Sequence, residues 1–182
     1  TESYSGGIIC GEYSGLDAMG NQAGWRTFIY RDNIAQPQPS EDDVYIFCSD
    51  NPTERVEEIR GIAPMTPANT TLMQIRTDLR DLQAALERYY EDNTMYPTTE
   101  QGTMALRVRA EGDHSPQVFP DGGYLEKNPL DPWGRLYILE SEPFGGVKPS
   151  YRLLTLGADG KEGGTGADAD IVLTDLKYLD LL

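Results

Sequence analysis

The chain has 182 residues, a formal net charge of −15 at pH 7 and an apolar content of 38%, a composition typical of a globular protein with one domain or one domain and a small second module. The acidity argues against nucleic acid as a partner, because binding phosphates requires clustered lysine and arginine. No apolar run approaches the roughly 18 residues that span a bilayer, and Thr1 opens no signal-peptide pattern.

Residues 1–66 are rich in glycine and polar residues, and three short apolar or aromatic runs interrupt them. Runs of this kind between turn-forming residues predict short strands. The three predicted strands are Ile8 to Cys10, Trp25 to Tyr30 and Val44 to Cys48. We therefore expect a β-rich N-terminal segment, 1–66, that is either a separate module or a fused sequence.

The two cysteines, Cys10 and Cys48, have a spacing that fits neither a zinc site nor a redox motif. In an oxidising compartment they would form a disulfide that closes a loop of about 38 residues and contributes roughly 3–4 kcal/mol. The alternative is a pair of buried free thiols. The single histidine, His114, lies in a polar loop, where we expect it to be exposed.

From Thr66 onward the pattern becomes helical. Thr66 is a typical N-cap, Pro67 a typical first helical residue, and Asn93 followed by Pro97 marks an end. Between them, apolar residues recur at spacings of three and four, which places them on one stripe of a helix over 67–93. The stripe, which we expect to pack on the protein's own sheet rather than in a coiled coil, consists of Leu72, Ile75, Leu79, Leu82, Leu86 and Tyr89.

Short elements are predicted after this helix. One or two helical turns come first, then strands separated by loops, and the apolar C-terminal residues 176–182 are expected to pack back. One long helix followed by a small antiparallel sheet is an α+β architecture. The helical turns are predicted at Thr103 to Val108, the strands at Leu136 to Leu139, Tyr151 to Leu156 and Ile171 to Leu173, and a turn at Gly145-Gly146.

The segment from Asp159 to Asp170 holds four glycines and four carboxylates. Glycines let a backbone turn its carbonyls inward, and gathered carboxylates repel one another unless a cation lies between them. Oxygen ligands on a flexible loop suit calcium, which accepts many oxygens in loose geometry. The loop is not an EF-hand, because Gly160 and Lys161 break the alternating ligand positions of that motif.

Several motifs follow one another in a fixed order. They are Glu91-Asp92-Asn93 at the helix end, Tyr96-Pro-Thr-Thr-Glu-Gln-Gly102, Asp131-Pro-Trp-Gly134 and the acidic loop from Leu156 to Ile171. In this order they resemble the globular part of the major pseudopilins of type II secretion systems, within the type IV pilin superfamily, over residues 67–174. The resemblance implies a pilin-like α+β domain over 67–182, with a long N-terminal spine helix packed on a small antiparallel sheet and a C-terminal calcium loop.

The same resemblance implies a ligand set for a structural calcium ion. Side-chain and backbone oxygens both contribute, and the choice between the last two carboxylates as the direct ligand is open. Glu162 is expected to be solvated. The implied ligands are the side chain of Asp159, the backbone carbonyls of Leu156 and Lys161, and the carboxylates of Asp168 and Asp170.

The function that the resemblance implies is structural. The protein would polymerise with itself and with other pseudopilins, on an inner-membrane assembly platform, into a periplasmic pseudopilus that drives export of folded proteins. In the native full-length form an N-terminal membrane anchor with a methylated N-terminus is expected, and residues 1–66 do not resemble it. The alternative is a minor pilin or an adhesin-like binding module that uses residues 1–66 and the loop 110–123.

An enzymatic function is not expected. The chain has no nucleophile motif, P-loop or dinucleotide fingerprint. A glycosidase needs two carboxyl groups on either side of a cleft. Because 30 acidic residues produce such pairs by chance, composition does not support this activity.

Overall fold

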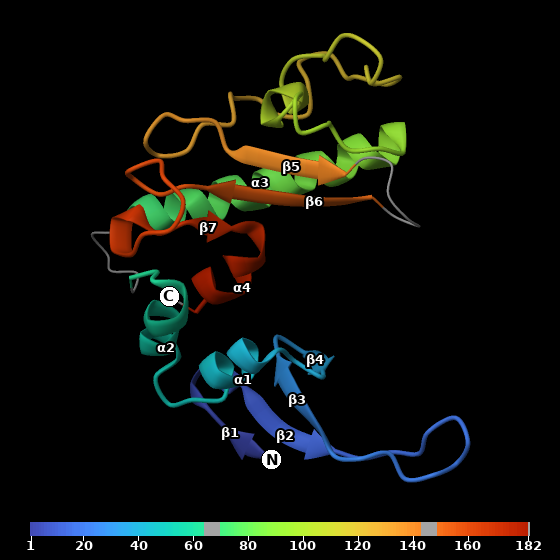
Figure 1. The fold of residues 1–182 in the computed structure, drawn as a ribbon, viewed down its shortest axis with the longest axis vertical. Helices are drawn as coiled ribbons and strands as arrows, with labels where there is room; N and C mark the ends of the chain where they lie inside the picture. Colours follow the sequence, from blue (N-terminus) through green and yellow to red (C-terminus); the bar gives the residue numbers. More distant parts are fainter. Residues whose placement is uncertain (64–69, 143–148, 182) are drawn as a thin grey trace. The chain divides into compact units, whose positions relative to one another are not determined.

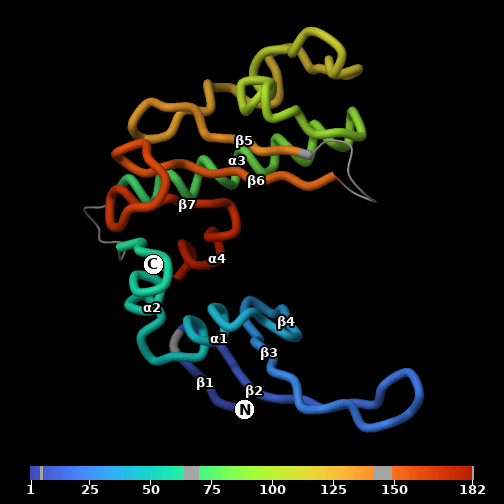
Figure 2. Tube along the Cα trace, viewed as in Figure 1, coloured from blue at the N-terminus to red at the C-terminus, as the bar shows by residue number. Residues whose placement is uncertain are grey.

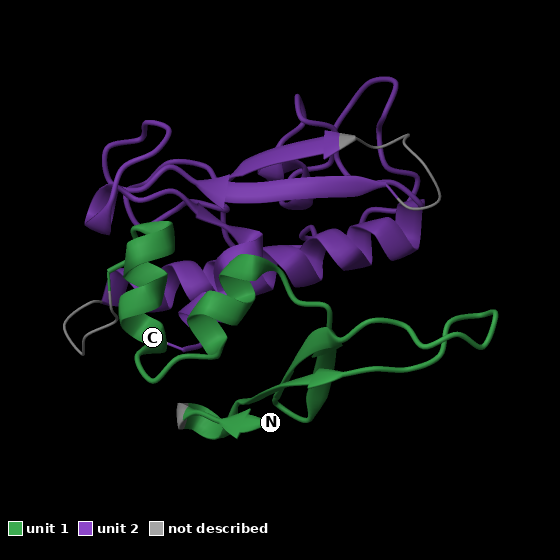
Figure 3. Ribbon diagram, turned by 60° about the horizontal axis from the view of Figure 1, so that its bottom comes forward, with its two compact units in different colours: residues 1–64 green, residues 65–182 purple. Residues whose placement is uncertain are grey.

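The computed structural model describes residues 1–63, 70–142 and 149–181 (Figure 1). The chain divides into two units, Thr1–Pro64 and Met65–Leu182, which Figure 3 colours separately. The predicted boundary between residues 66 and 67 falls outside the described residues. Within the described ranges, no helix has the length and apolar character needed to cross a membrane.

The first unit contains a four-stranded antiparallel sheet in the order β1-β2-β3-β4. Cys10 in β2 lies opposite Ile29 in β3, and both are buried. Opposite residues share one face of a sheet, so this pair lies on the inner face. The predicted strands near 8–10 and 25–30 are confirmed. The elements are β1 Glu2–Ser3, the 3-10 turn η1 Ser5–Gly7, β2 Ile9–Tyr13, β3 Arg26–Arg31 and β4 Ile34–Pro37.

The predicted strand Val44 to Cys48 is wrong, because these residues form most of helix α1, Glu41–Phe47, and its C-cap. The Ser40 hydroxyl accepts a hydrogen bond from the Asp43 backbone N–H at 3.1 Å and so caps the helix. Three acidic residues in the first turn interact favourably with the positive end of the helix dipole. The buried residues are spaced as on a helix face: Asp43, Ile46 and Phe47.

A second helix of this unit, α2 Pro52–Arg60, was not predicted either. Pro52 occupies its first turn, and Gly61, with a φ of 66°, ends it in the left-handed conformation that glycine adopts readily. A disulfide joins Cys10 in β2 to Cys48 after α1, so the oxidised alternative is the one observed. The bond ties the sheet to the helical part of the unit.

In the second unit the long helix is α3, Thr70–Asn93. The predicted start at Thr66 and Pro67 lies outside the described residues, and the predicted end at Asn93 is confirmed. All six side chains of the predicted stripe are buried. Figure 1 shows α3 running along one face of the sheet, so the helix packs on the protein's own sheet as expected.

That sheet has three antiparallel strands in the order β5-β6-β7. They are β5 Ile138–Glu142, β6 Ser150–Thr155 and β7 Ile171–Val172. The second and third predicted strands match within one residue. The first was placed two residues too early, because Leu136 pairs with Leu130 in an isolated bridge across the 131–134 turn. The predicted turn at Gly145-Gly146 lies outside the described residues.

Short helical turns complete the second unit: η2 Thr103–Leu106, η3 Gly166–Asp168, η4 Leu173–Asp175 and α4 Leu176–Leu179. Tyr178 and Leu179 of α4 are buried, and α4 contacts α3. An ion pair between Arg80 and Asp180, 2.5 Å apart, joins the C-terminal end to α3. The C-terminal residues therefore pack back as predicted. The predicted turns at 103–108 are the 3-10 turn η2, and His114 is exposed.

Candidate metal site

The glycine-rich acidic loop connects β6 to β7, and Figure 2 traces it in orange and red. Its two arms are in close contact. The Ala158 N–H donates to the Ala167 carbonyl at 2.8 Å, and a Cβ added at Gly157 would lie only 2.5 Å from the Asp168 carbonyl oxygen. An added Cβ at Gly164 would overlap the same oxygen. Both glycines have positive φ, a conformation that glycine adopts without a steric penalty. Gly157 and Gly164 therefore let the loop backbone pack directly against the Asp168 peptide.

Asp170 is the predicted ligand with the most informative surroundings. Its Oδ2 accepts a hydrogen bond from the Gly163 N–H at 2.9 Å. Its Oδ1 is buried and has no hydrogen-bond partner among the residues that the structure describes. A buried carboxylate oxygen without a donor is costly, so such an atom calls for a cation or an ordered water. This oxygen fits the expected metal.

The other predicted carboxylates are more exposed. Asp159 Oδ1 accepts the Lys161 N–H at 3.0 Å, which turns the chain locally. The Asp168 side chain and Glu162 are exposed. In the described ranges, no three carboxylate, histidine or cysteine groups gather at metal-binding separations. The structure brings the loop backbone close to Asp170 but does not gather Asp159, Asp168 and Asp170 into one cluster.

Backbone oxygens would therefore have to complete a metal site here. The Leu156 carbonyl already accepts the Gly160 N–H at 3.2 Å, but a carbonyl has two lone pairs and can accept a second partner. Calcium takes mixed sets of carboxylate and carbonyl oxygens, whereas most other protein-bound metals prefer nitrogen, sulfur or stricter geometry. The atoms of this loop that are predicted to bind a metal ion are all carboxylate or carbonyl oxygens, the ligand type that calcium prefers.

Sequence reasoning missed Arg135. Its Nη1 donates to the Ala158 carbonyl at 3.2 Å, and its Nη2 donates to the Gly157 carbonyl. The same guanidinium lies 3.6 Å from Asp131 Oδ2. The only signal in the sequence was its position directly after the Asp131-Pro-Trp-Gly134 motif. That motif gave no indication that the side chain reaches a loop more than 20 residues away.

Asp131 anchors this arrangement, with a side chain only 2% exposed. Its Oδ1 accepts the backbone N–H groups of Trp133 at 3.0 Å and Arg135 at 2.9 Å. Its Oδ2 accepts the hydroxyl of Thr155, at the end of β6, at 2.8 Å. One buried carboxylate thus joins the 131–135 turn to the strand that leads into the acidic loop.

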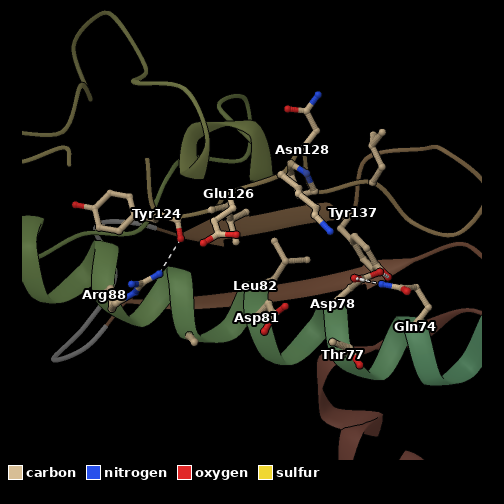
Figure 4. A pocket seen from close by; sticks show the side chains of 15 residues that line it. Gln74, Thr77, Asp78, Asp81, Leu82, Arg88, Tyr124, Glu126, Asn128 and Tyr137 are labelled. Atoms are coloured by element: carbon tan, nitrogen blue, oxygen red, sulfur yellow. Dashed lines mark hydrogen bonds between the residues drawn. The ribbon is translucent and has the colours of Figure 1, made fainter. Parts of the chain in front are cut away.

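A groove of about 540 Å³ lies elsewhere in this unit, between α3 and the segment 124–130 (Figure 4). Arg88 donates to the Tyr124 carbonyl at 2.7 Å. Asp78 accepts hydrogen bonds from Gln74 at 2.7 Å and from the Tyr137 hydroxyl at 3.0 Å. Burial raises the pKa of the Asp78 carboxyl, and this effect exceeds the opposing effect of the two hydrogen bonds, which lower the pKa. The hydrogen bonds hold this carboxyl in place, as is typical of a structural group.

A long helix packed on an antiparallel sheet, with an acidic glycine loop between the last two strands, defines a pilin-like α+β domain. The family described as "Type II secretion system (T2SS), protein G" matches residues 66–174. The match covers more than half of the chain, so the chain belongs to this family. The family's description places its members in type II secretion systems.

Curated relatives carry the same description. The type II secretion system core protein G of Pseudomonas aeruginosa is 41% identical over 105 residues, covering 58% of this chain and 72% of the relative. That of Vibrio cholerae is 45% identical over 95 residues, covering 52% of this chain and 62% of the relative. A crystal structure of the major pseudopilin from enterohaemorrhagic Escherichia coli is 30% identical, with a TM-score of 0.47, covering 60% of this chain and 98% of that one.

Proposed function

We propose that this protein is a structural subunit of the pseudopilus of a type II secretion system. In the periplasm it polymerises, with other pseudopilins and an inner-membrane assembly platform, to drive export of folded proteins. The family match over residues 66–174 carries this proposal, because it includes the described helix, the sheet and the acidic loop. In this proposal the full-length protein is anchored in the inner membrane and methylated at its N-terminus.

The packing of α3 limits how copies of the protein associate. The stripe residues Leu79, Leu82 and Leu86 are at most 2% exposed, and they belong to the helix that runs along the unit's own sheet (Figure 1). A subunit cannot use a buried stripe to contact its neighbour without unfolding. Filament contacts of the globular domain must therefore come from other faces, such as the polar side of α3.

We predict that deleting the gene for the full-length protein abolishes export of type II substrates, which then accumulate in the periplasm. Reintroducing the intact gene should restore export, because the filament needs its major subunit. Immunoblots of medium and periplasm measure the distribution of one substrate. A resident periplasmic protein that stays in the periplasm controls for leakage. Unchanged export after deletion would contradict the proposal.

One feature of the first unit favours the alternative, a minor pilin or an adhesin-like binding module. The hairpin between β2 and β3 exposes three large apolar side chains: Leu16 by 73%, Met19 by 88% and Trp25 by 71%. Asp17 stiffens its tip by accepting the backbone N–H groups of Met19 and Asn21, each at 2.9 Å. Loss of surface binding, with export intact, after deletion of the gene would support this alternative.

We further propose that the loop between β6 and β7 binds a structural calcium ion. The buried, unpartnered Asp170 Oδ1 supports this proposal, as does the all-oxygen donor set of the loop. The ion would neutralise the loop's carboxylates and hold its turns together. Since the unfolded chain has no such site, binding free energy becomes folding free energy. The residues that would hold it are Asp159 and Asp168 or Asp170 by side chain and Leu156 and Lys161 by backbone carbonyl, and the ion would have to draw the separated carboxylates together.

We predict that millimolar calcium raises the melting temperature by roughly 5–10 °C over the value in chelator. Calcium at a hundred times its Kd adds about 2.7 kcal/mol, and each kcal/mol shifts melting by roughly 2–4 °C in a chain of this size. Asp159→Ala should remove most of the difference, while Glu162→Ala, the matched exposed carboxylate, should keep it. Thermal unfolding with calcium, magnesium or chelator measures this. Identical melting of the wild type in calcium and chelator would refute the proposal.

A further inference from the structure

We propose that Arg135 is a positioning residue for the acidic loop. Its guanidinium holds the first part of the loop, residues 157–160, in the ion-binding conformation before calcium arrives. This inference rests on the calcium function proposed above. Arg135 lies outside the loop, and it would order residues 157–160 in a way that the loop's glycines and carboxylates do not.

The contacts of the guanidinium concentrate on the first turn of the loop. Two of its nitrogens donate to consecutive carbonyls, those of Gly157 and Ala158, the latter at 3.2 Å. It also lies directly beside Gly160, where an added Cβ would be 3.2 Å from the Arg135 Nη1 and Cζ atoms. A planar guanidinium with donors in a fixed fork can hold two adjacent carbonyls at once, which a lysine ammonium cannot do with the same geometry.

The arginine is itself held by the buried Asp131. The carboxylate of Asp131 accepts the backbone N–H of Arg135 at 2.9 Å and lies 3.6 Å from its guanidinium. The indole ring of Trp133 lies 5.6 Å from the guanidinium carbon, within cation–π range. Because the Arg135 side chain is 40% exposed, its net charge acts through solvent. Its directed hydrogen bonds to the loop are therefore the part of the interaction that matters.

The loop then divides into two halves with different needs. Arg135 holds the half at Gly157 to Gly160 without any ion. The other half, Gly163 to Asp170, contains the buried Asp170 Oδ1, to which no group in the described part of the chain donates a hydrogen bond. Calcium would satisfy that oxygen and complete the loop. Since part of the loop is already ordered, the ion has less conformational entropy to overcome, which raises its affinity.

The test compares Arg135→Met, which keeps the length of the side chain but removes its donors, with Arg152→Met. Arg152 is a matched control because it pairs with Glu140 at 3.0 Å on the exposed surface of the sheet. Calcium affinity is measured by isothermal titration calorimetry on the whole chain. Removing a partner that orients a metal loop typically weakens metal binding about tenfold or more. We expect a rise of about that size in Kd for Arg135→Met, and none for Arg152→Met.

Hydrogen exchange in chelator provides a readout that does not depend on calcium. The reporters are the N–H groups of Ala158 and Gly160, which are hydrogen-bonded within the loop. They should exchange faster in Arg135→Met and unchanged in Arg152→Met. If Arg135→Met does not fold, Arg135→Lys takes its place, because lysine keeps the charge and loses the two-carbonyl geometry. In Arg135→Lys, the exchange rates of the Ala158 and Gly160 N–H groups should also rise, but by less than in Arg135→Met.

Unchanged Kd together with unchanged exchange in Arg135→Met would overturn the proposal. So would an equal loss of stability in calcium and in chelator with an unchanged Kd, since that result assigns Arg135 to the fold alone. Wild-type protein that binds no calcium would refute the calcium function and, with it, any role of Arg135 toward the ion. In that case, exchange that still depends on Arg135 would separately show that the arginine orders the loop.

Discussion

Replacing Gly157 with alanine should destabilise the second unit by about 3 kcal/mol or more. The new Cβ would lie 2.5 Å from the Asp168 carbonyl oxygen. This oxygen belongs to the backbone, so it cannot move aside by a side-chain rotation. The residue would also have to adopt a φ of +61°, which disfavours any side chain. Relief would require opening the two arms of the loop. The loss of unfolding free energy is measured by urea titration, with hydrogen exchange of the α3 amides as the probe of unfolding.

Gly163→Ala is the matched control, because Gly163 lies in the same loop with a φ of +92° and has nothing within 4 Å of its added Cβ. It should cost only the backbone term, about 1–2 kcal/mol. Calcium binding should be retained in Gly163→Ala and lost in Gly157→Ala. Equal losses of stability in the two variants would contradict the close packing of the loop against Asp168.

Removing the Cys10–Cys48 bond, by reduction or by changing both cysteines to serine, should unfold the first unit. The bond spans 38 residues, and closing a loop of that length contributes about 4 kcal/mol on the chain-entropy model. A unit of this size has a small core, which rarely supplies more than about 3–5 kcal/mol. Loss of the bond therefore removes nearly all of its stability.

Hydrogen exchange resolved along the chain measures this effect. Amides of β2 and β3 should lose their protection in the reduced protein, and amides of α3 serve as the internal reference. Substituting Ser49, which lies next to Cys48 and donates to the Ile46 carbonyl at 2.8 Å, with alanine controls for local disturbance at this turn. Protection that persists in β2 and β3 after reduction would contradict the prediction.

Much of the second unit was predictable because its pattern is long and regular. The stripe from Leu72 to Tyr89 spans five turns, and only one helical face fits it. The run Val44 to Cys48 was too short for periodicity to distinguish a strand from a helix. The deciding signal lay just before it, in the cap Ser40 and the acidic residues 41–43 that follow. Short apolar runs need their flanking residues to be interpreted.

The position of the candidate loop between the last two strands was predictable, but the contacts of its residues were not. Glycines and carboxylates marked the loop, and the family resemblance supplied the ligand set. The buried Asp170 oxygen and the Arg135 donors depend on tertiary packing. Arg135 and Ala158 are 23 residues apart, and no local pattern encodes a side chain that reaches so far. Such contacts follow only once the turn at Asp131 and the end of β6 are placed together.

The ion pair between Arg80 and Asp180 has a consequence for the order of folding. Its partners are 100 residues apart, and α4, which contacts α3, is among the last segments of the chain. Helix α3 can form early from local hydrogen bonds, but its partners in β5, β6 and α4 emerge from the ribosome only afterward. Until residues 138–181 arrive, its apolar stripe has no cover from the sheet. Between the synthesis of α3 and that of these later segments, the apolar face of the amphipathic helix is open to solvent and to chaperones, and the second unit closes only once α4 has been made.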